Sequence, residues 1–63
     1  MPDAPTWLNT NSAGAYLGIT PATLHRLVHK GEVVAYQIGR ARRYRQDDLD
    51  RYLDAARIRP EVR

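Results

Sequence analysis

The spacing of hydrophobic positions changes twice along the chain. Between residues 8 and 31 they recur at helical spacing, which predicts two short helices joined by a brief turn. Between residues 33 and 45 β-branched and aromatic residues cluster around a glycine, as in a hairpin, and from residue 46 the helical spacing returns. This pattern predicts a mostly α fold with a small β-hairpin.

The first helix is predicted to begin after Asn9 and to end at Gly18. Asn9 is a favourable N-cap, Ser12 stands at the third position of a weak capping box, and glycine commonly ends helices. Its core positions are Ala13, Tyr16 and Leu17. Gly14 costs about 1 kcal/mol relative to Ala inside a helix. We therefore expect a neighbouring helix to approach closely at this position.

The second helix is predicted from Thr20 to Gly31. Thr20 is the N-cap, Pro21 suits the first helical position, and Gly31 suits a left-handed C-cap. Ile19 lies in the turn and is expected to point inward. The buried stripe consists of Leu24, Leu27 and Val28. Helix, short turn and helix together indicate a helix-turn-helix, whose second helix usually contacts DNA.

The hairpin is predicted from VVAYQI (33–38) and RRYR around Tyr44, joined by a loop at residues 39–41. The side chains expected to face inward are Tyr36 or Ala35, Ile38 and Tyr44. A third helix is predicted from about residue 46 to residue 57, and acids in its first turns oppose the positive end of the helix dipole: Asp47, Asp48 and Asp50. Its expected core face is Leu49, Tyr52, Leu53 and Ala56.

With 63 residues the chain is expected to hold one small domain. We assign residues 1–6 to a flexible N-terminal arm, 7–57 to the domain and 58–63 to a basic C-terminal tail. The absence of cysteine removes disulfides and the best zinc ligands. No apolar run approaches the roughly 20 residues that span a bilayer, and the N-terminus lacks a signal pattern, so no membrane partner and a cytoplasmic location are expected.

Positive charge is concentrated in the central third of the chain. The net charge of the whole chain is +3, yet residues 25–45 alone carry +5, with Glu32 as their only acid. Such clustering is typical of a site for a polyanion. On a helical wheel the second helix carries small residues at its N-terminal end and then cations, as a helix in a major groove requires. The predicted DNA-contacting residues are Pro21, Ala22, Thr23, His25, Arg26, His29 and Lys30.

The hairpin adds a second basic cluster, with Arg40 at its tip and Arg42 and Arg43 after it. Arginine suits phosphates and narrow minor grooves, so these three are predicted to form a DNA-binding wing. The alternative for Arg43 or Arg45 is a structural role, in which the guanidinium pairs with an acid such as Asp48. Helix-turn-helix and wing together predict a winged helix-turn-helix.

The sequence gives little support for metal binding, base stacking or catalysis. His25 and His29 have a metal-binding spacing, but no third ligand is evident, and no metal site is predicted. Aromatic residues that would serve as base-stacking platforms occur at core spacing instead: Trp7, Tyr16 and Tyr52. No nucleophile–base pair or glycine-rich phosphate loop is present. The protein is therefore expected to have no enzymatic activity, no cofactor and no small-molecule substrate.

From Leu8 to Leu53 the chain resembles the excisionase-type helix-turn-helix family, a relative of the MerR-like winged-helix group. The matching segments lie at residues 8–9, 13–20, 23–27, 31, 35–39, 43 and 48–53. One departure is that the family often has Glu in the first helix, where this chain has Ser12 or Ala13.

The resemblance implies a phage or mobile-element excisionase, also called a recombination directionality factor, inside a bacterial host cell. Such a protein binds double-stranded DNA cooperatively beside neighbouring copies of itself, bends it and directs an integrase towards excision. The alternatives are a small MerR-like or excisionase-like transcriptional regulator and a protein-interaction module.

Overall fold

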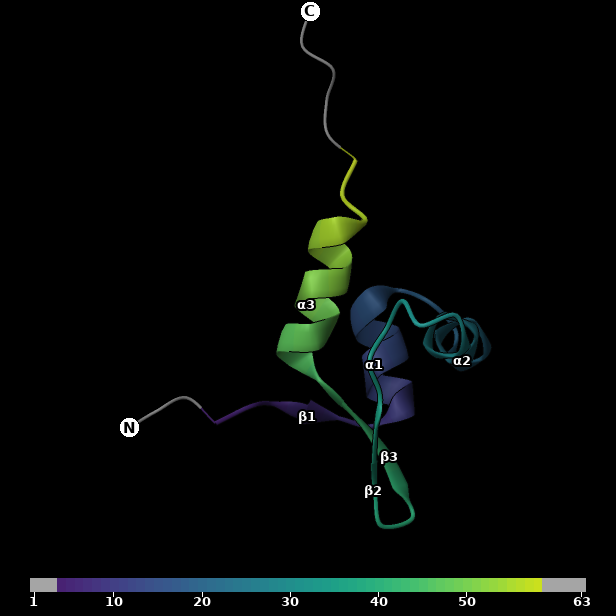
Figure 1. Cartoon of the computed structure of the whole chain (residues 1–63), viewed down its shortest axis with the longest axis vertical. Helices are drawn as coiled ribbons and strands as arrows, with labels where there is room; N and C mark the ends of the chain where they lie inside the picture. The colour runs from purple at the N-terminus through teal and green to yellow at the C-terminus, as the bar shows by residue number, and fades with distance from the viewer. Residues whose placement is uncertain (1–3, 59–63) are drawn as a thin grey trace, which may run out of the picture.

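A computed structural model describes residues 4–58 (Figure 1). In chain order the elements are β1 (Trp7–Leu8), α1 (Thr10–Leu17), α2 (Pro21–His29), β2 (Tyr36–Ile38), β3 (Ala41–Arg45) and α3 (Gln46–Ala55). The strands form one antiparallel sheet in the order β1-β3-β2. This is the predicted winged helix-turn-helix, with β1 as an unexpected third strand. Residues 1–3 of the expected arm and 59–63 of the expected tail lie outside the described residues.

The predicted caps of α1 are confirmed. The Asn9 side chain accepts the N–H of Ser12 at 2.7 Å, and Gly18 ends the helix with a φ of 75°. Only glycine adopts this left-handed conformation at little cost. The N–H of Ile19 then donates to the carbonyl of Gly14 at 2.9 Å, which folds the turn back onto the helix.

Gly14 leaves room for that turn. A Cβ at this position would lie 2.9 Å from the carbonyl oxygen of Ile19 and 3.7 Å from the backbone nitrogen of Pro21. The expected close approach is therefore present, although its nearest atom belongs to the turn before α2 and not to that helix.

The predicted start of α2 is confirmed, and its C-cap is Lys30, one residue before the predicted Gly31. The hydroxyl of Thr20 accepts the N–H of Thr23 at 3.2 Å, Pro21 opens the helix, and Gly31 follows its end with a φ of 81°. Leu24 is fully buried, and Leu27 and Val28 pack beside it against the core. Figure 1 views α2 nearly along its axis while α1 runs across it, so the two helices cross steeply.

The hairpin is tighter than predicted. Ile38 pairs with Ala41, so the turn contains only Gly39 and Arg40, and the expected three-residue loop is wrong by one position. β2 begins at Tyr36 instead of residue 33. Pairing of the hairpin with β1 was not expected, because a two-residue strand has too little pattern to detect.

The core takes one fully buried or nearly buried side chain from each helix, from β3 and from the loop after α2. These are Ala13, Leu24, Val33, Tyr44 and Leu49. Other side chains pack around them: Leu8, Leu17, Ile19, Leu27, Val28, Ala35 and Tyr52. A core of this size supports only a few kcal/mol of stability.

Some residues predicted to be buried are exposed instead: Tyr16 (42%), Ile38 (53%), Leu53 (40%) and Ala56. Ile38 lies near the end of the hairpin, on the sheet face opposite to Tyr44. Leu53 lies in the second half of α3, which extends beyond α1 in Figure 1, and Ala56 is the C-cap of this helix. The exposed hydroxyl of Tyr16 donates to Asp50 of α3, and this hydrogen bond raises the pKa of the tyrosine.

A charged network joins β3 to α3. The guanidinium of Arg45 donates two hydrogen bonds to Asp47, Nε to Oδ1 at 3.1 Å and Nη2 to Oδ2 at 2.8 Å. Partial desolvation raises the pKa of Asp47, but the Arg45 guanidinium, the N–H of Asp48 and the charge of Arg51 together outweigh it, and the pKa falls below its usual value. Asp48 instead accepts from the hydroxyl of Tyr36 at 2.9 Å and pairs with Arg51.

Gly14→Ala tests the close approach of the turn. We expect a lower free energy of unfolding although Ala is the better helix former, because the new Cβ would force the turn away from α1. The control is Ser12→Ala, an exposed position of the same helix. Chemical denaturation measures both, and an unchanged or more stable Gly14→Ala variant would contradict the packing at the turn.

Asp47→Asn tests the β3–α3 network through pH. Because the pKa of Asp47 is lowered in the folded state, its contribution is present above the unfolded pKa of about 4 and is lost as the pH falls through the folded pKa. The Tm of Asp47→Asn should therefore lie below that of the wild type at pH 7, and the two values should converge in acid. Asp54→Asn, at an exposed position of the same helix, is the matched control. A constant gap at all pH values would contradict this linkage.

Candidate nucleic-acid interface

α2 turns its apolar side inward and its polar side to solvent. Thr23 is half-buried, and the other residues predicted to contact DNA are exposed: Pro21, Ala22, His25, Arg26, His29 and Lys30. Their placement agrees with the helical wheel. Contact with DNA stays a prediction for each of them.

A row of three polar side chains runs along the N-terminal part of this face. The Thr20 hydroxyl donates to Oγ1 of Thr23 at 3.0 Å, and Nη2 of Arg26 donates to the same oxygen at 3.4 Å. The guanidinium is thereby drawn towards the N-terminus of α2. A side chain held in this way has less rotamer freedom to lose on binding. From the sequence Thr20 is predicted only as a cap, and its spacing of three residues to Thr23, with Arg26 three further on, is the signal for this row.

The outward face of α2 is free of acidic side chains. The nearest carboxylate in sequence is Glu32, whose Oε2 lies 3.8 Å from Nζ of Lys30. Both side chains are about half exposed or more, so this pair is screened by water and weak. Lys30 therefore remains available to an anion.

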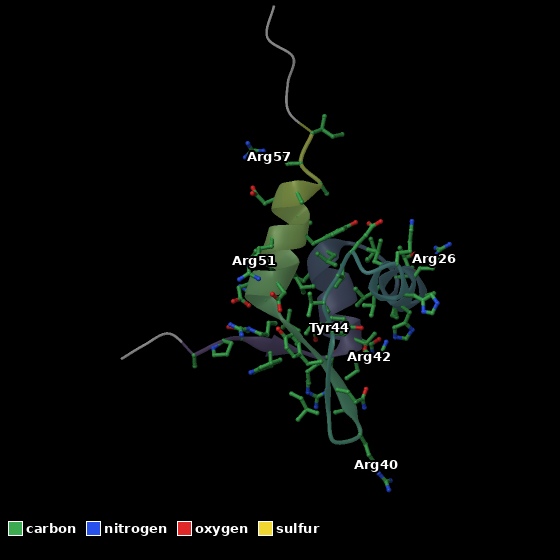
Figure 2. The ribbon with its side chains drawn as sticks, viewed as in Figure 1. Arg26, Arg40, Arg42, Tyr44, Arg51 and Arg57 are labelled. Carbon is green, nitrogen blue, oxygen red and sulfur yellow. The ribbon has the colours of Figure 1, made fainter. Side chains whose placement is uncertain are left out.

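The tip of the wing presents Arg40 to solvent. Gly39 adopts a φ of 61° and the Gln37 side chain donates to its carbonyl at 3.2 Å, which stabilises the tight turn. Figure 2 shows Arg40 at the end of the hairpin, Arg42 between that end and α2, and Arg26 on α2 itself. These three arginines lie on the same side of the molecule, and Arg51 and Arg57 lie on the other side with α3.

The strand register separates Arg42 from Arg43. Tyr44 is fully buried against the helices, and side chains alternate between the two faces of a strand. Arg42 therefore shares the Tyr44 face, on the α2 side, whereas Arg43 lies on the opposite face. Arg42 is exposed and Arg43 is half-buried.

The structural role considered for Arg43 or Arg45 is taken by Arg45. Its partner is Asp47, an acid at the start of α3 as expected, although Asp48 was the example given. The guanidinium also lies 5.9 Å from the centre of the Trp7 ring. Among residues 4–58, Arg43 forms no ion pair and donates only to the carbonyl of Arg42.

Trp7 is less buried than a core residue. Its side chain is 41% exposed and packs edge-on against Tyr36, with ring centres 5.2 Å apart. The hydrogen bond to Asp48 raises the pKa of Tyr36 above its ordinary value. This aromatic pair covers the sheet face opposite to Tyr44, so it contributes to the base of the wing.

The site offers surface cations and backbone donors instead of metal-binding chemistry. His25 and His29 are both exposed on α2. Within the part of the chain that the structure describes, three or more His, Cys, Asp or Glu side chains nowhere come close enough to hold a metal ion.

A model of the helix-turn-helix domain family matches residues 7–57. The chain belongs to this family. The match spans α1, the turn, α2, the wing and α3, and the family is associated with excisionase-like proteins. No curated protein matches the chain.

A helix-turn-helix domain implies sequence-specific binding to double-stranded DNA, and domains of this family are typically not enzymes. No helix within residues 4–58 is both long and apolar enough to cross a membrane.

The register of β3 predicts unequal roles for two adjacent arginines of the helix-turn-helix domain. Arg42→Ala should weaken binding to duplex DNA and reduce its salt dependence by about one phosphate contact, because Arg42 faces the α2 side. Arg43→Ala removes the same charge from the other face and should have a smaller effect. Fluorescence anisotropy with a labelled duplex measures both, and an equal or larger loss for Arg43→Ala would contradict this assignment.

Proposed function

We propose that this helix-turn-helix protein is an excisionase that binds specific DNA sites and directs an integrase towards excision. The observation that carries the DNA-binding part is the cationic side formed by α2 and the wing. It combines Arg26, Lys30, Arg40 and Arg42, and α2 adds no acid to it. The excisionase part is supported by the family match and by the resemblance of residues 8–53.

In the proposed complex α2 lies in the major groove. Ala22 and the exposed N-terminal turn allow the backbone to approach the DNA closely. In the first turn the N–H of Ala22 is left for a phosphate, since Pro21 has no N–H and those of Thr23 and Leu24 donate to Thr20. Arg26 lies one turn further along and has the length and planar geometry to contact guanine O6 and N7. His25, His29 and Lys30 contact the flanking backbone.

The wing lies beside α2 and extends the contact along the duplex. Arg40 enters an adjacent minor groove or contacts its phosphates, and Arg42 contacts the backbone between the wing and α2. Because the two elements contact neighbouring grooves, binding favours a bent duplex. Several copies bind adjacent sites, on the DNA of a bacterial host cell, and the protein has no catalytic step of its own.

Arg26→Ala tests base recognition. On a site selected from a random pool of duplexes, the loss of a base contact should cost about 1 to 3 kcal/mol of binding free energy, with a much smaller loss on unrelated DNA. Arg51→Ala is the matched control, since Arg51 is an exposed arginine of α3 on the other side. Equal losses on all sequences would show that Arg26 contacts phosphate.

Salt dependence measures the electrostatic part of the same interface. Phosphate contacts by the three cations Lys30, Arg40 and Arg42 predict a slope of about −3 in a plot of log binding constant against log salt concentration. A slope near zero would instead support a protein-interaction module.

An excision assay with the cognate integrase then separates an excisionase, which stimulates excision, from a transcriptional regulator, which leaves it unchanged.

A further inference from the structure

The second half of α3 is not covered by the rest of the chain. Leu49 is fully buried, but Leu53, Ala55 and Ala56 are exposed, and Ile58 beyond the helix is 91% exposed. In Figure 1 this part of the helix extends past α1 on the side away from α2. The DNA interface makes no use of these apolar side chains.

A groove of about 420 Å³ runs beside this helix half. Its apolar lining comes from Val34, Tyr52, Ala55 and Ala56. Its charged lining consists of Glu32, Asp48 and Arg51, and because Arg51 pairs with Asp48, Glu32 at the rim is the carboxylate left for a cation from outside. Alanines at the helix end allow another backbone to approach closely. An apolar side chain flanked by a cation would fit both parts of the lining.

The chain itself carries such a segment. Arg57 and Ile58 follow directly after the end of α3, and both are exposed. α3 has the opposite charge, since four aspartates outnumber the single Arg51. A parallel pair of α3 helices would place aspartates against aspartates, whereas an antiparallel pair brings the basic end of each chain towards the acidic half of the other.

We infer that a second copy of this chain docks in the groove, antiparallel and related by a two-fold axis. The helices cross at Ala55, where the side chains are smallest. Ile58 of each copy then packs against Tyr52 and Val34 of the other copy. The two-fold axis makes this contact twice, once on each side of the crossing point at Ala55. Arg57 approaches Glu32 at the rim of the facing groove.

The docking is expected to be weak in solution. One short helix and one side-chain contact per copy bury less than the roughly 1,200 Å² of a standard stable interface. Two copies held on adjacent DNA sites gain a high effective concentration, so the same contact becomes sufficient there. The role on DNA rests on the proposed function, whereas the docking itself can be tested on the protein alone.

Single-cysteine crosslinking tests the arrangement, because the chain has no cysteine of its own. Ala55→Cys lies at the proposed two-fold axis and should form a disulfide-linked dimer on mild oxidation of the full chain. Ala15→Cys is the matched control, an exposed alanine on α1 outside the groove. We expect a several-fold higher dimer yield for Ala55→Cys on non-reducing gels. Equal yields would overturn the proposal.

Second-site changes in the Ala55→Cys protein test the specific contacts. Ile58→Ser should lower the dimer yield several-fold, and so should Arg57→Glu. Adding Glu32→Arg to Arg57→Glu should restore the yield, because the glutamate at position 57 of one copy then pairs with the arginine at position 32 of the other. A yield that does not respond to Ile58→Ser or is not restored by the double reversal would overturn this docking mode, even if Ala55→Cys crosslinks. Binding of the unmodified protein to a duplex with a single site, measured separately, reports on the proposed function alone.

Discussion

Burial of Tyr44 is the constraint on which the rest of the structure depends. This is the largest fully buried side chain, and it joins the sheet to α1, α2 and α3 through the shared core. Because side chains alternate between the two faces of a strand, burial of Tyr44 also determines which sheet face each of the remaining β3 side chains occupies. Arg42 consequently faces the α2 side, and Arg43 and Arg45 face away from it. The Tyr44 hydroxyl is buried without a hydrogen-bond partner in residues 4–58, so packing and not polar pairing holds the ring in place.

The same alternation divides the charges of this helix-turn-helix domain between two sides. Arg45 is directed to the start of α3, where its guanidinium pairs with Asp47. The side formed by α2 and the wing stays cationic, as binding of DNA requires. α3 presents acids and uncovered apolar side chains on the other side. One small fold thus separates the cationic side of α2 and the wing from the uncovered apolar side chains of α3.

Local signals allowed much of the fold to be predicted from the sequence. The N-caps Asn9 and Thr20 and the glycines after both helices act within one turn, and the structure confirms all of them. Non-local pairing was harder to predict. The two residues of β1 become a strand only because β3 lies beside them, and Ile38 is exposed because the hairpin extends beyond the helices. The choice of Arg45 over Arg43 as the structural arginine required the strand register, which the sequence pattern left open.

The central claim is that α2 and the wing form one continuous surface for duplex DNA. Its most direct test is a titration of the isotopically labelled protein with a duplex, followed by the backbone amide signals in NMR spectra. Saturable shifts are expected to concentrate in residues 21–31 and 39–42, with small changes along the exposed side of α3. Shifts confined to α3, or the absence of saturable shifts in α2, would contradict this claim.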